Sequence, residues 1–490
     1  MITSTRSLLI FIVLVLIFVA ALQPVTDPDF WWHLKTGQLI VQTKTIPHVD
    51  IFSYTRLGKE WVTHEWLSEV FIYGVFRLSG FAGLMVVFAC LITVSFWITY
   101  LRFRERLGNP VIAVFALVLG AAATTQFWAV RPQILSLLFV SIFLYILDSY
   151  YYAKSTRAIW WLVPLTILWV NLHAGFLIGL GLIALTIVGL VLDGFLLTSS
   201  RSTLRRVPTL LGLFLVCGVA VSVNPNGTRL YWLPVETLTT PVFMRAIEEW
   251  KSPDFHQLQL QPFLLLLLAT FSILALSNKR ARPGELLLLV AISFAALRTG
   301  RNVAFFSLVA TPLFAEHFGK WLETQSWAKP LMPAKDAEPN KISFAKMVLN
   351  SLMIVLVLAI STLGIKRTTS KQAEAEQQAF PFAAVNFMLA QRPPQPIYNE
   401  YDWGGYLIWR LHPNYLVYID GRADPFGGQL VEECIQVHDG APGWQEVLKN
   451  RGIRTVLVRF DSAIASLLRQ KSEWKNVFED KQAVIFVLQQ

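Results

Sequence analysis

Charged residues are scarce in this sequence. Only 15% of its 490 residues are Asp, Glu, Lys or Arg, whereas 54% are hydrophobic. Soluble domains usually have about 25% charged residues, so this chain has too little polar surface for a soluble protein of its length. The high hydrophobic content also excludes an intrinsically disordered chain. The composition therefore indicates a protein that crosses a membrane several times.

Cysteine is scarce as well. The three cysteines are Cys90, Cys217 and Cys434, and the first two lie within hydrophobic runs. There they would pack as small apolar side chains. Their number and spacing exclude a disulfide framework and a cysteine-ligated metal centre.

Hydrophobic runs recur from the N-terminus to residue 365. Because about 20 apolar residues span a bilayer, the runs predict about eleven transmembrane helices. The runs are residues 8–22, 81–101, 111–128, 132–150, 158–173, 175–197, 207–223, 261–278, 284–299, 302–319 and 346–365. The first run could be a signal peptide, but we expect it to stay uncleaved because many spans follow. The amphipathic segment 66–79 either lies at the membrane interface or extends the second span.

The net charge of +10 is unevenly distributed along the chain. With Arg6 in the cytoplasm, every second connection is basic. These connections carry Arg102, Arg104, Arg106, Lys154, Arg157, Arg201, Arg205, Arg206, Lys279, Arg280, Arg282, Lys320, Lys329, Lys335 and Lys341. Because basic loops stay in the cytoplasm, we expect a multi-pass protein of the plasma (inner) membrane with a cytoplasmic N-terminus. The excess charge then orients the spans, and we expect no nucleic-acid partner.

The composition changes after residue 365, on the outer side of the membrane. Short β-like runs and amphipathic helical stretches alternate there, which is typical of an α/β domain. The β-like runs are residues 396–398, 416–420, 455–459 and 483–488, and the helical stretches are 443–450 and 461–470. We therefore predict an all-α polytopic membrane domain (1–365) with a large first outer loop (23–80), followed by an extracytoplasmic α/β domain (366–490).

The first outer loop has the richest chemistry. Asp27 and Asp29 directly follow a span, where charge is expensive and tends to be functional. Two carboxylates at this spacing can share a divalent cation, or one can act as a base. The alternative is a solvated loop in which Trp31 and Trp32 form an aromatic interface belt. Downstream, His64 and Glu65 alternate with aromatic residues, a combination that suits a sugar site.

A first span followed by Asp-x-Asp in a long outer loop resembles the GT-C glycosyltransferases. This superfamily includes the oligosaccharyltransferase catalytic subunit, the protein O-mannosyltransferases and the lipid A aminoarabinose transferase. Residues 27–37 look like the first-loop pattern of the oligosaccharyltransferase. Residues 61–67 resemble an acidic position in the mannosyl and aminoarabinose enzymes. The number of spans and the outer C-terminal domain suit the same superfamily.

The resemblance implies an inverting sugar transfer at the outer face. The donor would be a polyprenyl-phosphate or polyprenyl-diphosphate sugar within the membrane lipids, and the acceptor a glycan, lipid or protein. A first-loop Asp would act as base, and Asp27 with Asp29 would bind Mg²⁺ or Mn²⁺ if the reaction uses a divalent cation; otherwise we expect no cofactor. The candidate catalytic residues are Asp29, Asp27 and Glu65, and the candidate substrate-binding residues are His33, Trp32, His64, Arg131, His173, Arg298, Arg301, Asp402 and Tyr406.

The basic candidate residues lie in outer connections, although most of the positively charged residues lie in the connections predicted to be cytoplasmic. Arg298 and Arg301 connect two spans, and the planar guanidinium group suits phosphate oxygens. The alternative for Arg298, Arg301 and Arg131 is interfacial snorkelling. His173 ends a span at the same level and either binds a hydroxyl group or caps the turn.

The C-terminal candidates rest on a second resemblance. Residues 399–406 look like a permuted form of the oligosaccharyltransferase acceptor motif WWDYG, followed further on by Asp420 and Arg422. Two tryptophans do not precede Asp402, so recognition of an Asn-x-Ser/Thr acceptor is not implied. The alternative is the start of a strand with a Gly-Gly turn. The second acidic motif of that enzyme is missing near residues 126–133, which leaves metal dependence open.

Two other classes of protein fit parts of the pattern. A transporter or flippase of a lipid-linked sugar or anion would also use outer arginines, but it predicts charges within spans or duplicated halves. The spans contain few charges, and we find no duplication. A non-catalytic assembly protein predicts that the first-loop carboxylates are replaceable.

Overall fold

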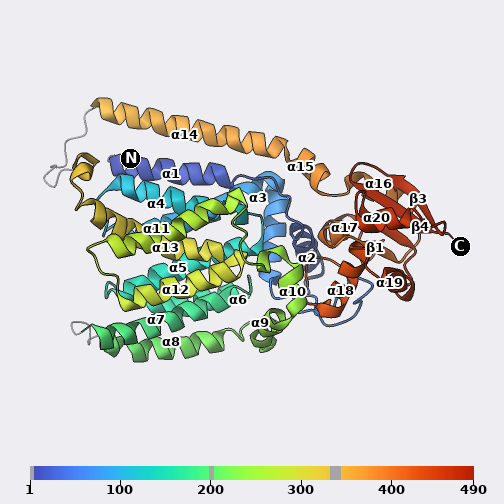
Figure 1. Cartoon of the computed structure of the whole chain (residues 1–490), viewed down its shortest axis with the longest axis horizontal. Helices are drawn as coiled ribbons and strands as arrows, with labels where there is room; N and C mark the ends of the chain where they lie inside the picture. Colours follow the sequence, from blue (N-terminus) through green and yellow to red (C-terminus); the bar gives the residue numbers. More distant parts are fainter. Residues whose placement is uncertain (1–4, 198–202, 332–343, 490) are drawn as a thin grey trace.

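The computed structural model describes residues 5–197, 203–331 and 344–489. Long helices lie side by side and form a bundle at one end of the molecule, whereas the chain after residue 380 forms a compact α/β region at the other end (Figure 1). The N-terminus lies at the end of the bundle that faces away from this region. Three of the predicted cytoplasmic residues, Arg201, Lys335 and Lys341, fall outside the described residues.

The bundle helices correspond to the predicted spans. They are α1 (Thr5–Ala21), α3 (Trp66–Phe103), α4 (Pro110–Ala122), α5 (Pro132–Tyr151), α6 (Leu162–Val170), α7 (Phe176–Leu196), α8 (Val207–Ala220), α11 (Gln261–Leu276), α12 (Pro283–Arg298), α13 (Val303–Leu322) and α14 (Phe344–Ser370). Among the described residues, six helices are long and apolar enough to cross a membrane. The chain is therefore a multi-pass membrane protein, and the larger number of spans stays a prediction.

The basic connections of the bundle lie together at one end. Glu316, near the end of α13, accepts ion pairs from Arg106 at 3.0 Å and from Lys279 at 2.5 Å. Arg6, before the first span, donates to the Tyr100 hydroxyl group at 2.9 Å. The predicted cytoplasmic residues Arg6, Arg106 and Lys279 thus lie at the end of the bundle that faces away from the α/β region.

The first outer loop contains one complete helix and the first part of another. Helix α2 (Phe30–Thr43) starts immediately after Asp29 and packs against the first part of α3. The contact is close, because a side-chain carbon at Gly37 would overlap the backbone carbonyl of Glu69. The amphipathic segment 66–79 belongs to α3 and joins the following span through a kink at Gly80, where φ is 61°. The segment is therefore a separate helix and not a straight extension of the second span, and its place at the membrane interface stays a prediction.

A second outer segment lies between α8 and α11. It contains α9 (Arg229–Thr239), α10 (Pro241–Ala246) and the short 3-10 helices η4 (Glu248–Trp250) and η5 (Leu258–Leu260). Helix α10 packs against α18 of the C-terminal region. This segment therefore connects the bundle with the α/β region on the side opposite to α14 (Figure 1).

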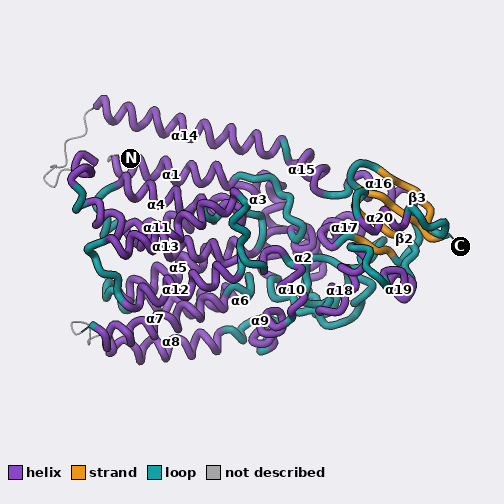
Figure 2. Tube along the Cα trace, viewed as in Figure 1, coloured by secondary structure: helices purple, strands orange, loops and turns teal. Residues whose placement is uncertain are grey.

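The C-terminal region contains one small sheet, which Figure 2 shows at the far end of the molecule. Its strands have the order β1-β2-β4-β3, with β1 parallel to β2 and the other pairs antiparallel. The strands are β1 (Ile397–Asn399), β2 (Thr455–Arg459), β3 (Trp474–Glu479) and β4 (Ala483–Leu488). The helices are α15 (Gln372–Ala379), α16 (Phe382–Gln391), α17 (Gly404–Leu411), α18 (Gly427–His438), α19 (Trp444–Asn450) and α20 (Ala463–Leu468).

Two local predictions for this region are wrong. Residues 416–420 are not a strand of the sheet, because their backbone bonds to the first outer loop: Val417 donates to Phe52 at 3.0 Å and accepts from Tyr54 at 3.2 Å. The alternative of a Gly-Gly turn also fails, since Gly404 and the following residues start helix α17. Helix α17 packs against α2, so the C-terminal region covers the first outer loop.

Candidate active site

A cavity of about 1050 Å³ lies where the outer end of the bundle, the segment with η4 and the C-terminal region meet. It is large enough for a substrate of several sugar units or a lipid headgroup with its sugar. The predicted residues that line it are Asp27, Asp29, Trp32, His33, His64, Glu65, Arg131, His173, Arg298, Arg301 and Asp402. Residues from five separate parts of the chain thus meet in one space, and their roles stay predictions.

Tyr406 is the predicted site residue that does not line this cavity. Its side chain is fully buried, and its ring stacks on Phe380 at 4.8 Å and meets Trp31 edge-on at 5.0 Å. Its hydroxyl group donates to Glu376 and accepts from Arg410. The position of Tyr406 contradicts direct contact with substrate and indicates a packing role between α2 and the C-terminal region. Trp31 is likewise buried in this contact and not part of an interface belt.

Arg131 is the centre of an ionic cluster at the start of α5. Its guanidinium group lies 2.7 Å from Asp29 Oδ2 and 3.4 Å from Asp27 Oδ2, and it also pairs with Glu249. Asp27 Oδ1 accepts the backbone N–H of Asp29 at 2.9 Å, and Trp32 donates its indole N–H to Asp29 Oδ1 at 3.2 Å. Asp29 is therefore held from two sides, with its carboxylate in the cavity.

Three carboxylates share this one guanidinium group. Burial raises the pKa of Asp29 to about 7; Arg131 opposes this shift, and Asp27 and Glu249 add to it. Burial also raises the pKa of Asp27, whereas Arg131 and Arg301 hold the pKa of Glu249 below its ordinary value against the effect of burial. A carboxylate with a pKa near neutrality is suited to accept a proton during a reaction.

The same cluster bears on the predicted metal ligands. The positively charged Arg131 already binds the Asp27 and Asp29 carboxylates that a divalent cation would need. Within residues 5–197, 203–331 and 344–489, no group of three or more His, Cys, Asp or Glu side chains is arranged to hold a metal ion. The two aspartates as placed do not fit a Mg²⁺ or Mn²⁺ site. A requirement for such an ion stays a prediction.

Glu65 lies among three imidazole rings. Its carboxylate oxygens are 3.5 Å from His33 Nε2, 3.6 Å from His64 Nε2 and 3.4 Å from His173 Nε2. Burial lowers the pKa of His33 to about 3 and that of His173 to about 4. Burial acts on His64 in the same direction, but Glu65 outweighs it and raises the pKa to about 9. At neutral pH one ring is therefore charged and two are neutral, a mixture of donors and acceptors that suits hydroxyl groups.

The orientation of His173 follows from its neighbours. Its Nδ1 atom accepts the backbone N–H of Gly175 at 2.9 Å and lies 2.7 Å from the Ser136 hydroxyl group. The ring proton therefore belongs on Nε2, which faces Glu65. The turn that carries His173 is held by Asn171, whose side chain accepts from the Trp66 indole at 2.8 Å. Of the two roles predicted for His173, holding the turn thus belongs to Asn171, whereas His173 itself faces the cavity.

Arg298 and Arg301 occupy the connection between α12 and α13. The Arg301 guanidinium group stacks over Trp250 at 4.7 Å from the ring centre. The backbone of this connection bonds to the segment after η4, with Gly300 donating to the Lys251 carbonyl at 2.9 Å. Across the described part of the chain, neither arginine side chain forms a hydrogen bond or ion pair. Both are available to bind an anion in the cavity.

The second resemblance pointed to Asp420 and Arg422, but the sequence did not show that their loop, residues 420–424 of the C-terminal region, forms part of the cavity wall. Its Asp-Gly pair signals a turn, but only the fold shows what the turn faces. Ala423 has a positive φ of 52°, and the next residue, Asp424, lines the cavity and accepts from the Thr237 hydroxyl group at 3.1 Å. Several further cavity residues were not candidate site residues, among them Glu248 and Glu249 of η4.

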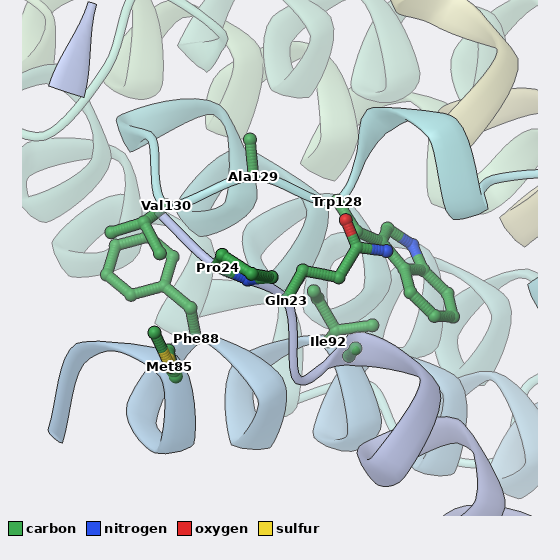
Figure 3. A pocket seen from close by; sticks show the side chains of 9 residues that line it. Gln23, Pro24, Met85, Phe88, Ile92, Trp128, Ala129 and Val130 are labelled. Atoms are coloured by element: carbon green, nitrogen blue, oxygen red, sulfur yellow. The ribbon is translucent and has the colours of Figure 1, made fainter. Parts of the chain in front are cut away.

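A second, much smaller cavity lies behind the first outer loop. Its volume of about 10 Å³ is that of a single water molecule. Figure 3 shows Pro24 between Met85 and Phe88 of α3 and the chain segment 128–130. This tight apolar packing fixes the end of α1 and thereby the start of the segment that carries Asp27 and Asp29.

Comparisons with known proteins complete the description. No protein-family model matches the sequence. No curated protein matches it either. Among solved structures, the oligosaccharyltransferase AglB of Archaeoglobus fulgidus, in complex with an inhibitory peptide and a dolichol-phosphate, is similar with a TM-score of 0.55 and 12% identity over 93% of this chain and 69% of that chain.

Two further solved structures are similar. ArnT from Cupriavidus metallidurans, bound to undecaprenyl phosphate, has a TM-score of 0.52 and 13% identity over 98% of this chain and 97% of that chain. The arabinofuranosyltransferase AftD from Mycobacteria has a TM-score of 0.50 and 13% identity over 98% of this chain and 41% of that chain. At such low identity the likeness concerns the fold, and this chain has the GT-C fold that these three membrane glycosyltransferases share.

Proposed function

We propose that this protein is an inverting glycosyltransferase that moves a sugar from a polyprenyl-phosphate carrier to an acceptor at the outer face of the membrane. One observation carries the proposal: the half-buried Asp29–Arg131 pair lies in the same cavity as Arg298 and Arg301, two arginines that form no ion pair among the described residues. A base and an anion site in one cavity are what a transfer with a phosphate leaving group needs.

The topology in the proposal follows the predicted charge distribution. The basic ends of the bundle face the cytoplasm, and about eleven helices cross the membrane. The cavity and the C-terminal region then lie outside. Several of the helices are short, and local thinning of the bilayer and snorkelling of flanking side chains accommodate such spans. The N-terminus is cytoplasmic in this arrangement.

Arg298 and Arg301 form the donor phosphate site. They connect two bundle helices, so a lipid chain lying beside the bundle reaches them with its headgroup at the membrane surface. Guanidinium groups bind phosphate oxygens through charge-assisted hydrogen bonds. Among the solved structures with this fold, ArnT was obtained with undecaprenyl phosphate and the archaeal enzyme with a dolichol-phosphate, which supports a lipid phosphate as ligand.

Asp29 is the base in this mechanism. The acceptor hydroxyl or amide group gives its proton to Asp29 Oδ while its heavy atom attacks the anomeric carbon from the face opposite the phosphate. The bond from the anomeric carbon to the phosphate oxygen breaks, and its electron pair stays on that oxygen. Arg301 and Arg298 stabilise the additional negative charge. The single displacement inverts the configuration at the anomeric carbon.

Asp27 has a positioning role in this account. Its Oδ1 atom is engaged with the backbone N–H of Asp29, so it fixes the turn that presents the base. The cluster of Glu65, His33, His64 and His173 binds sugar hydroxyl groups next to the base. Asp402, from the C-terminal region, lines the cavity with an exposed carboxylate, and in this account it contacts the acceptor.

The test is transfer by the purified full-length protein in lipid vesicles. The donors are polyprenyl-phosphate-linked radiolabelled sugars, and the acceptors are glycan, lipid and peptide preparations. We expect Asp29→Asn to reduce transfer by a factor of roughly 10² to 10⁴, the usual contribution of a general base. The matched control is Asp254→Asn, because Asp254 is exposed in the same outer segment as η4 and pairs with His256.

Two outcomes would overturn the proposal. Full transfer by both Asp27→Asn and Asp29→Asn variants would show that the first-loop carboxylates are not part of the chemistry. Movement of the intact lipid-linked sugar across vesicles without cleavage from its carrier would favour the flippase alternative.

A further inference from the structure

Glu249 is an anion placed inside the proposed donor site. It lies on η4, and its carboxylate pairs with Arg131, which already binds Asp29 and Asp27. Its pKa is held below the ordinary value by both Arg131 and Arg301, so the carboxylate lies within the field of both guanidinium groups. Glu249 is therefore ionised at neutral pH, between the proposed base and the proposed phosphate site.

The charges around this carboxylate leave little room for a second phosphate. Arg131 is shared by three carboxylates, whereas Arg298 and Arg301 form no ion pair among the described residues. A sugar phosphodiester carries one negative charge and leaves as a monoester with up to two, which two arginines can balance. In a diphosphate donor, an additional phosphate group would lie between these arginines and the anomeric carbon, facing Glu249 and Asp29.

We propose that Glu249 makes the cavity selective for a lipid carrier with a single phosphate. The inference rests on the proposed function and narrows its donor class. Like charges brought together in a partly buried site oppose binding strongly. The additional phosphate group of a diphosphate would need a positive charge next to Glu249. The nearest such charge, on Arg131, is already paired with Glu249. With a monophosphate carrier, the sugar and the acceptor occupy the part of the cavity next to Glu249.

The neighbouring residue provides a matched control. Glu248 lies one position earlier on the same short helix and also lines the cavity, but its side chain is 77% exposed and pairs with Lys251 and not with Arg131. Removing the charge of Glu248 therefore changes the net charge of the segment by the same amount without touching Arg131. The Glu249→Asp variant keeps the charge and tests whether the position of the side chain alone matters.

The experiment measures binding to the purified full-length protein in detergent. The probes are undecaprenyl phosphate and undecaprenyl diphosphate, and the readout is the ratio of their dissociation constants for each variant. We expect the wild type to prefer the monophosphate by about tenfold or more. Glu249→Gln should shift the ratio toward the diphosphate by about tenfold, whereas Glu248→Gln and Glu249→Asp should keep the wild-type ratio.

The outcomes separate the two proposals. Tight binding of both probes without preference, or an unchanged ratio in Glu249→Gln, would overturn the role of Glu249 and leave the proposed function standing. Binding of neither probe by the folded wild type would overturn the proposed donor itself. A melting curve for each variant shows whether a loss of binding reflects loss of the fold.

Discussion

The backbone of Gly421 lies directly against the carboxylate of Asp29. A side-chain carbon added at Gly421 would overlap Asp29 Oδ1, although the two residues belong to opposite ends of the chain. The turn that contains Gly421 is fixed by Arg422, which donates to Asp420 and Asp50 at 2.7 Å in a fully buried arrangement. The C-terminal region therefore forms one wall of the site and holds the proposed base in place.

Gly421→Ala should reduce transfer while the protein stays folded. The added methyl group displaces the Asp29 carboxylate, and a misplacement of about 1 Å can cost about 10²-fold in rate. We expect kcat to fall and KM for the lipid donor to stay within about threefold, because the phosphate site is formed by other residues. Gly108→Ala is the control, since a side-chain carbon there would meet no atom within 4 Å. Full activity of Gly421→Ala would contradict the contact.

Removing Arg131 should change the pH dependence of transfer. In the wild type, Arg131 counteracts the increase in the pKa of Asp29 that burial causes. In Arg131→Gln, the three carboxylates lose this shared cation. The pKa of Asp29 then rises further, and the pH at which activity reaches half its maximum moves upward. Arg131→Lys keeps the charge and should show a smaller shift. An identical pH profile for wild type and Arg131→Gln would argue against Asp29 as the titrating base.

Arg422 should be essential for stability. Its replacement by Met leaves Asp50 and Asp420 buried without a partner, which typically costs about 3–5 kcal/mol. The triple variant Asp50→Asn, Asp420→Asn, Arg422→Met removes the uncompensated charges and should recover part of the loss. Thermal unfolding of the detergent-solubilised protein measures both effects. A single variant as stable as the wild type would show that the C-terminal region is held to the first loop by other contacts.

The ion pair between His64 and Glu65 should make stability depend on pH. The folded-state pKa of His64 is about 9, above its ordinary value of 6.5. The stabilisation is therefore complete below about pH 6.5 and is lost as the pH rises through 9. The difference in melting temperature between wild type and His64→Gln should be largest near pH 6 and should vanish above pH 10. A difference that is constant with pH would indicate that the ring contributes by packing alone.

The first outer loop could be predicted from the sequence because its signals are local. Asp27 and Asp29 directly follow a span, and His64 and Glu65 stand beside aromatic residues, so their chemistry is visible without the fold. The outer arginines could be found in the same way, since Arg298 and Arg301 break the pattern of basic cytoplasmic connections. These residues indeed meet in one cavity.

The other features of the fold and of the site could not be predicted, because they depend on contacts between segments that are far apart in the sequence. Residues 416–420 alternate like a strand, but their hydrogen bonds go to the first outer loop and not to the sheet. Tyr406 stands in an acceptor-like motif, yet helix α17 turns its ring toward Trp31. Glu249 and Asp424 carry no local signal that distinguishes them from exposed loop carboxylates. Their position in the cavity follows only from the packing of α10 and the C-terminal region at the outer end of the bundle.

The pH dependence of transfer by the purified protein tests the central claim most directly. The Asp29 carboxyl group, with a pKa raised to about 7, must be deprotonated to accept the proton of the acceptor. We predict that kcat/KM increases with pH through a single ionisation near 7 and then reaches a plateau, and that this ionisation disappears from the residual activity of Asp29→Asn. A wild-type rate that is constant between pH 5 and 8, or an Asp29→Asn variant with the same ionisation, would contradict the account.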